Sequence, residues 1–144
     1  RERRLMYVEL SDEARRYIGR FDELTGVAPT DCLVEGDRLV FVVPAGEMAS
    51  AIGQGGETVA EAERRLGKSI ELVEDADTAE AFVASTLAPA AVNAVTISEQ
   101  NDRVAYVEVP EADRGVAIGA EGANIETARR LAARHYDVDD VQLT

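Results

Sequence analysis

The chain has 144 residues, of which 46% are hydrophobic, and its 28 acidic against 15 basic residues give a formal net charge of −13. No apolar run approaches the roughly 18 residues that span a bilayer, and no signal pattern precedes the first helix-like segment. The sequence therefore predicts a soluble, cytoplasmic protein without a membrane segment, built as one compact domain or two small ones. The single cysteine, Cys32, cannot form an intrachain disulfide, and its apolar neighbours predict a buried small hydrophobe.

The negative charge argues at first against nucleic-acid binding, because proteins that bind nucleic acids usually carry a basic footprint. The basic residues change this interpretation: 14 of the 15 are arginine, and Lys68 is the one lysine. We interpret this composition as an adaptation to high salt. At about 1 M salt the Debye length falls to roughly 3 Å, so the self-repulsion of an acidic surface is screened. Negative charge then says little about the ligand.

The first quarter of the chain predicts a helix followed by a β-hairpin. Residues 5–10 alternate in hydrophobicity, which indicates a short strand or an extended lead-in. Ser11 is a good N-cap, and apolar residues then recur at helical spacing until Gly26 ends the helix. The apolar runs 32–34 and 39–43 flank a short segment that contains glycine, an arrangement typical of a hairpin.

A glycine-rich segment follows the hairpin. Residues 48–52 predict a short helix with Met48, Ala51 and Ile52 on one apolar face, and helical spacing resumes after Gly56 until residue 66. The segment between them therefore predicts a turn joining two helices. Residues 69–73 then alternate as a third strand, and the acidic residues 74 and 75 mark a boundary.

The same order returns in the second half. Asp77 and Glu80 resemble a capping box at the start of a helix, residues 92–98 and 103–109 predict a hairpin, and two helices surround residues 119–122 before a short strand at 138–143. An offset of 66 residues pairs Ile52 with Ile118. We predict an α+β protein of two domains, residues 1–75 and 76–144, packed as a rigid pair.

The repeated glycine turn suggests a binding function. Glycines at both ends let the backbone approach a partner closely, and the amides at the start of the following helix favour an anion such as phosphate. The turn is thus a plausible clamp for a nucleic-acid backbone. The alternative is a helix stop followed by a helix start, with no ligand.

A glycine-x-x-glycine turn between two helices, backed by a three-stranded sheet, resembles the KH module, which grips about four single-stranded nucleotides. With a helix first, each unit resembles the type II KH fold. Over nearly the whole chain, the sequence resembles the archaeal NusA-like transcription factors. The resemblance lies in the tandem units, in Leu24-Thr25-Gly26-Val27 before Asp31-Cys32, and in Ala117-Ile118-Gly119 after residues 104–107. The resemblance implies a single-stranded RNA-binding protein of transcription elongation, termination or antitermination, without the polymerase-binding N-terminal domain of NusA.

The candidate RNA-binding residues are the two turns, the isoleucine before each, and the basic residues that follow. They are Ile52, Gly53, Gln54, Gly55, Gly56, Arg64, Arg65 and Lys68, and Ile118, Gly119, Ala120, Glu121, Gly122, Arg129, Arg130 and Arg134. The family usually has a basic residue in each turn, whereas Glu121 would repel a phosphate at about 4 Å by roughly 1 kcal/mol in water. We expect the second turn to be the weaker site. Alternatively, the arginines are solvated helix faces paired with nearby acids.

Other site classes lack their residues. No nucleotide phosphate-loop pattern occurs, and His135, the only histidine, has no cysteine cluster, so we expect no metal site, no cofactor and no catalysis. His135 itself predicts a capping or surface residue. The remaining alternative is an acidic protein-interaction module that docks on RNA polymerase or a ribosomal partner and binds RNA weakly, which Glu121 favours.

Overall fold

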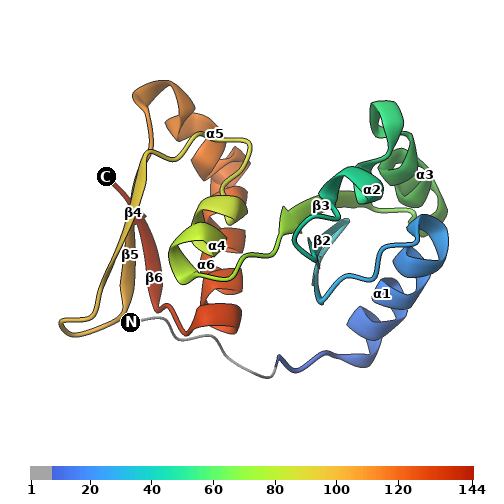
Figure 1. Ribbon diagram of the computed structural model, residues 1–144, viewed down its shortest axis with the longest axis horizontal. Helices are drawn as coiled ribbons and strands as arrows, with labels where there is room; N and C mark the ends of the chain where they lie inside the picture. The colour runs from blue at the N-terminus through green and yellow to red at the C-terminus, as the bar shows by residue number, and fades with distance from the viewer. Residues whose placement is uncertain (1–7) are drawn as a thin grey trace. The chain divides into compact units, whose positions relative to one another are not determined.

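The computed structural model describes residues 8–144, which form two compact units: residues 9–75, and residues 76–144 together with Val8 (Figure 1). Both units contain a helix, a hairpin, two helices joined by a glycine turn, and a last strand, which confirms the predicted α+β class and element order. Most of the lead-in predicted at residues 5–10 lies outside the described residues, and residues 8–10 have no regular structure. The packing of the units as a rigid pair stays a prediction. Over residues 8–144, no helix is both long and apolar enough to cross a membrane.

The first unit contains one three-stranded sheet. Its elements are α1 (Asp12–Thr25), β1 (Asp31–Glu35), β2 (Arg38–Val43), α2 (Met48–Ile52), the 3-10 turn η1 (Gln54–Gly56), α3 (Glu57–Leu66) and β3 (Ser69–Glu74). The strand order is β1-β2-β3. β2 is antiparallel to β1 and parallel to β3. The segment between β2 and β3 must therefore cross back along the sheet, and it carries the glycine turn.

Local sequence explains the ends of α1 and the core beneath it. The Ser11 hydroxyl accepts a hydrogen bond from the Ala14 amide at 3.0 Å, and Gly26 ends the helix in the left-handed conformation, as predicted. Phe21 of α1 packs on Phe41 of β2, with ring centroids 4.5 Å apart. Cys32 is buried in the same core, which confirms the prediction made for it.

The second unit repeats this topology. Its elements are α4 (Ala79–Thr86), β4 (Ala94–Ser98), β5 (Val104–Glu108), η2 (Glu111–Asp113), α5 (Arg114–Ile118), η3 (Ala120–Gly122), α6 (Ala123–Tyr136) and β6 (Asp140–Leu143). β5 is the central strand, antiparallel to β4 and parallel to β6. The 66-residue offset holds from the start of the central strand to the start of the helix after the turn. α6 has 14 residues and α3 has 10, so the last strands no longer share the offset.

Two predictions for the second unit are wrong in detail. The N-cap of α4 is Thr78, whose hydroxyl accepts from the Ala81 amide at 3.1 Å, because the extended residue next to the helix is Thr78 and Asp77 lies outside it. His135 is buried rather than exposed, and its ring centroid is 5.1 Å from that of Phe82. The cause is the length of α6, whose apolar stripe continues past Leu131 and carries His135 into the core.

Candidate nucleic-acid interface

The backbone at Gly53 requires glycine for two reasons. Its φ of 79° and ψ of 169° fall in a region that is essentially restricted to glycine. A Cβ added here would lie 2.1 Å from Thr58 Oγ1 and 2.8 Å from the Thr58 amide nitrogen, well inside contact distance. The α2 end of the turn is therefore packed directly onto the first turn of α3. Thr58 is not among the site residues that the sequence predicts, although the 66-residue offset pairs it with Asn124 in the second copy.

The middle of the first turn is open. Gly55 and Gly56 also have positive φ, of 64° and 79°, and a Cβ at either position would meet nothing within 4 Å. The hydrogen bonds within the turn use the amides of Gly56 and Glu57, which donate to the carbonyls of Gly53 and Gln54. Those bonds leave the amides of Gln54 and Gly55 uninvolved, at the start of α3, where the helix dipole favours negative charge.

The second turn has the same shape with a different residue at its centre. Gly119 has φ of 80° and ψ of 172°, and Gly122 has φ of 77°. Glu121 takes the place of Gly55 with φ of 55°, a left-handed conformation that costs most residues roughly 1–2 kcal/mol. Both Ala120 and Glu121 are exposed, so the carboxylate lies at the surface of the turn.

An exposed isoleucine precedes each turn. Ile52 and Ile118 are 38% and 39% exposed, and Val116 on α5 is 45% exposed. Ala51 and Ala117, one residue earlier, are fully buried. The predicted apolar face of α2 is therefore split: Ala51 packs inward and Ile52 lies outside, beside the glycine turn. Each turn thus combines backbone amides with an apolar side chain.

Comparisons with known proteins agree with this arrangement. Residues 79–143 match the domain family described as the NusA-like second KH domain, and residues 15–79 match the KH domain family. The probable transcription termination protein NusA of Halobacterium salinarum is 58% identical over 96% of this chain and 100% of its own length. The corresponding protein of Halococcus morrhuae is 57% identical over 96% and 99%. The chain belongs to the NusA family.

A solved structure supports the fold of this NusA-family chain. The crystal structure of APE1850 is 33% identical, covers 94% of this chain and 100% of its own, and has a TM-score of 0.82. The predicted pair of KH domains is thus confirmed for both halves of the chain. The Halobacterium and Halococcus relatives fit the high-salt adaptation that the composition predicts.

The three cations predicted to serve the first turn, Arg64, Arg65 and Lys68, lie away from it. Arg64 and Arg65 both bind Glu61, at 2.5 and 3.0 Å, and these hydrogen bonds, from Arg64 first and then Arg65, lower the pKa of Glu61. Lys68 Nζ donates to the Gly36 carbonyl at 2.7 Å. All three follow the middle of α3, whose ten residues place its end roughly 15 Å from the turn. The alternative of arginines paired with nearby acids thus describes Arg64 and Arg65.

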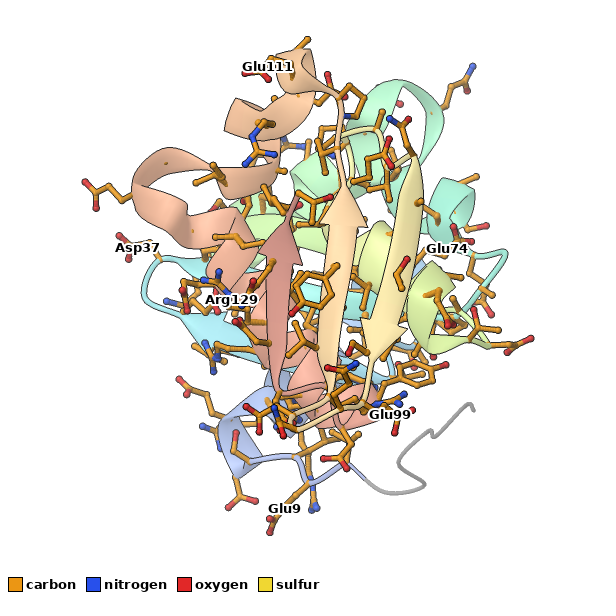
Figure 2. All side chains as sticks on the ribbon, turned by 90° about the vertical axis from the view of Figure 1, so that its left-hand side faces the viewer. Glu9, Asp37, Glu74, Glu99, Glu111 and Arg129 are labelled. Carbon is orange, nitrogen blue, oxygen red and sulfur yellow. The ribbon has the colours of Figure 1, made fainter. Side chains whose placement is uncertain are left out.

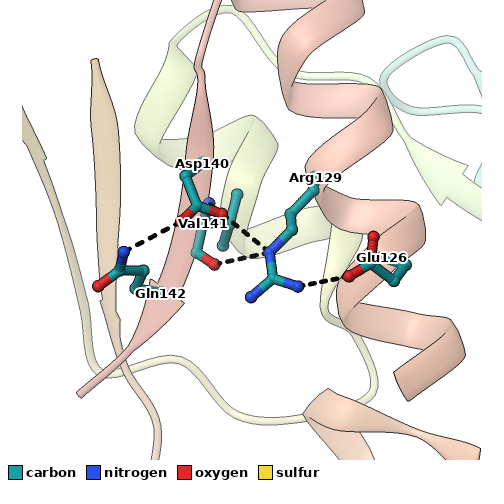
Figure 3. Close-up of polar contacts among 5 residues, drawn as sticks. All are labelled: Glu126, Arg129, Asp140, Val141 and Gln142. Carbon is teal, nitrogen blue, oxygen red and sulfur yellow. Dashed lines mark hydrogen bonds and ion pairs between the residues drawn. The ribbon is translucent and has the colours of Figure 1, made fainter. Parts of the chain in front are cut away.

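Arg129 of the second KH domain connects α6 to β6 (Figure 3). Its Nε lies 3.1 Å from the Val141 carbonyl and 2.9 Å from Asp140 Oδ1, and Nη1 lies 2.6 Å from Glu126 Oε2. Asp140 also accepts from Gln142 Nε2 at 3.0 Å, the largest of the interactions that lower its pKa. These contacts hold Arg129 inside its own domain. Arg130 is exposed and Arg134 half-buried on the same helix.

Acidic side chains border the second sheet as well. Glu111 and Glu99 lie at its two ends in Figure 2, after β5 and β4 respectively. Glu99 Oε2 accepts from Arg103 Nη1 at 2.9 Å, so that arginine is also held within the domain. Glu121 is therefore the acidic group that lies within the second turn itself, where the first turn has Gly55.

Proposed function

We propose that this protein binds single-stranded RNA through its glycine turns and acts in transcription elongation, termination or antitermination. The observation that carries this proposal is the first turn: a glycine-only backbone at Gly53, packed on Thr58, presents Gln54 and Gly55 at the start of α3. No side chain covers the backbone at Gly55, so a phosphate can approach its amide closely. The NusA-family relatives, named as probable termination proteins, support the biological context.

The proposed binding depends on the positions of the turn amides and of Ile52, and it needs no catalytic group. The helix dipole and the amides of the turn stabilise the phosphates, while Ile52 offers an apolar contact to a base. The chain acts here as a binding factor that works with the transcription complex. RNA polymerase is the partner that fits this role.

The two turns contribute unequally. Glu121 places a carboxylate where the first turn has Gly55. At about 4 Å from a phosphate, its repulsion amounts to roughly 1 kcal/mol in water and several-fold more when partly desolvated. We propose that RNA is held mainly by the first turn and continues to the second with weaker contact.

The proposal is tested by RNA binding in molar potassium chloride. Gln54→Asp/Gly55→Asp adds two charges to the first turn and should weaken binding by roughly tenfold or more. Gln54→Asn/Gly55→Asn is the matched control, since asparagine tolerates positive φ as aspartate does and adds no charge. The same Asp-Asp change at Ala120 and Glu121 should have a smaller effect, because one acid is already there. If neither acidic variant weakens binding, the turns are not the clamp.

The acidic surface adds a second test. Few basic groups are available to displace counterions, so RNA affinity should decline only gently between low and molar salt. A steep decline would contradict binding through backbone amides and helix dipoles.

Protein docking is the second candidate function. Glu121 in the second turn and the pairing of Arg64 and Arg65 with Glu61 favour it, because each reduces the attraction for RNA. In this case the acidic surface would bind RNA polymerase directly. Capture of purified RNA polymerase by the Gln54→Asp/Gly55→Asp protein, with unchanged RNA affinity, would favour docking over the clamp.

A further inference from the structure

Helix α1 of the first KH domain carries three arginines, Arg15, Arg16 and Arg20, that make no ion pair with any acid among residues 8–144. Among the residues that the structure describes, the side chains of Arg15 and Arg16 take part in no hydrogen bond or ion pair. The guanidinium of Arg20 contacts a neutral group, with Nη2 donating to the Arg65 carbonyl at 3.4 Å. Acids outnumber bases in this chain by 28 to 15, so arginines that make no ion pair within the described part of the chain stand out. Their donors are available to an anionic ligand.

Two of these arginines share a pocket with an aromatic ring. Arg16, Tyr17, Arg20 and Glu13 line a pocket of about 240 Å³. Arg16 and Arg20 are one helical turn apart and therefore lie on the same face of α1. Tyr17 is half-buried and packs on the hydrophobic core, so its ring has a fixed position. Guanidinium groups bind phosphate oxygens through paired N–H donors, and an aromatic side chain supports a stacked base.

The pocket lies near the C-terminal end of α3, and the glycine turn lies at the opposite end of this helix. Arg20 reaches the carbonyl of Arg65, in the last turn of α3, whereas the glycine turn precedes Glu57 at the other end. The ten residues between these ends span roughly 15 Å. About four nucleotides fill a KH turn, so a short RNA ends before it reaches α1. A longer strand that follows α3 meets the exposed Arg64 and Arg65 and then the pocket.

We propose that the α1 pocket is a second RNA subsite, in which Arg16 and Arg20 bind a phosphate and Tyr17 contacts a base of a strand leaving the first glycine turn. This inference rests on the proposed function. An aromatic ring beside two arginines that form no ion pair within residues 8–144 fits a nucleotide better than an acidic peptide, which would use the arginines alone. The Glu13 carboxylate in the same pocket repels the phosphate and weakens the subsite. The subsite therefore adds to the RNA affinity of the turn without replacing it.

The test compares RNA lengths in the full chain, by fluorescence anisotropy in molar potassium chloride with oligouridines of about four and about twelve nucleotides. The wild type should bind the longer RNA more tightly. Arg16→Gln and Arg20→Gln should each weaken binding of the longer RNA by roughly three- to tenfold and leave the shorter within about twofold. Tyr17→Leu, which keeps an apolar group against the core, should show the same length dependence. Arg15→Gln is the matched control: it removes the same charge from the same helix but does not line the pocket.

Each other outcome has a definite meaning. Equal effects of Arg15→Gln and Arg16→Gln on the longer RNA would overturn the subsite, as would equal loss for both RNA lengths or a wild type that does not distinguish them. An acidic protein as the true occupant would appear as unchanged RNA binding by all three arginine variants. Failure of the proposed function looks different, because Gln54→Asp/Gly55→Asp would then leave binding of the short RNA unchanged.

Discussion

The close approach of Gly53 to Thr58 predicts a large stability difference between glycines only a few residues apart. Gly53→Ala places a Cβ 2.1 Å from Thr58 Oγ1, 2.6 Å from its Cβ and 2.8 Å from its amide nitrogen. Rotation of the threonine hydroxyl relieves only the first of these contacts. Gly56→Ala, in contrast, has the same φ of 79° and nothing within 4 Å. The ψ angles differ, 169° at Gly53 and 12° at Gly56, so the difference between the two variants contains the clash together with the more restricted backbone of Gly53.

The expected magnitudes follow from these contacts. The backbone conformation of Gly53 costs another residue of order 1–3 kcal/mol, and overpacking adds about 1–3 kcal/mol, so Gly53→Ala should destabilise the first domain by about 2–6 kcal/mol. Gly56→Ala should cost about 1–2 kcal/mol. For Gly119→Ala the three nearest atoms all belong to the Asn124 side chain. Its amide group can turn away at the expense of its 2.9 Å hydrogen bond to the Val116 carbonyl, but the contact with Asn124 Cβ, at 2.9 Å, remains. The cost of Gly119→Ala should lie between the other two.

Cys32 supplies the assay for the first domain. It is the single cysteine, it is buried, and burial first, then Asp31 and Glu13, raises its pKa to about 12. At pH 8 the folded thiol is therefore protonated and inaccessible, and alkylation reports opening of the domain. The urea dependence of alkylation in molar potassium chloride gives the free energy of unfolding for Gly53→Ala and Gly56→Ala. Hydrogen exchange of β5 amides gives the corresponding value for Gly119→Ala.

A second-site change sharpens the comparison. Thr58→Gly removes the hydroxyl and Cβ but leaves the amide nitrogen, 2.8 Å from the added Cβ, in place. Relative to Thr58→Gly alone, Gly53→Ala/Thr58→Gly should therefore regain the part of the overpacking cost that comes from the threonine side chain, and keep the amide contact and the backbone cost. If Gly53→Ala and Gly56→Ala differ by less than about 0.5 kcal/mol, overpacking against Thr58 is refuted as a cause of the glycine requirement.

Three further predictions concern the second domain. Glu121→Gln should tighten RNA binding by about fivefold in an anisotropy titration, because it removes a repulsion of roughly 1 kcal/mol, and unchanged affinity would mean that no phosphate lies near this turn. Arg129→Met should destabilise the α6–β6 contact by about 1 kcal/mol without altering RNA affinity, since its ion pairs are partly exposed; hydrogen exchange of β6 tests this. The lowered pKa of Asp140 contributes stability above its usual value of 3.8 that is lost as pH falls through the lowered value. Gln142→Ala, which removes the largest cause, should flatten this acid dependence of the urea midpoint.

Features fixed by neighbouring residues could be predicted from the sequence. The helix from Ser11 to Gly26 and the hairpins needed only caps, turn residues and alternation. The two glycine turns followed from helical spacing interrupted at the same offset. The pairing of Arg64 with Glu61 stood among the alternatives because residues three apart on a helix are neighbours.

Features that depend on distant residues could not be predicted. The contacts of Arg129 with Asp140 join a helix to a strand whose register no local pattern specifies. The burial of His135 depends on α6 running one turn longer than its counterpart, so that the ring meets Phe82 of another helix. The contact of Gly53 with Thr58 depends on the angle between two helices. These are tertiary effects, and periodicity does not report them.

The parallel pairing of β2 with β3 links the turn to the order of folding. β1 and β2 are joined by two residues, and such a hairpin forms within about 1–10 μs. β3 can join only when residues 44–68 have folded back along the sheet, and long-range pairing of this kind is slow because chain entropy is lost before the strand contacts form. The glycine turn lies inside that connection. A nascent chain that has completed its first sheet has therefore also assembled its proposed RNA clamp, so the domain passes from unfolded to binding-competent in one cooperative step.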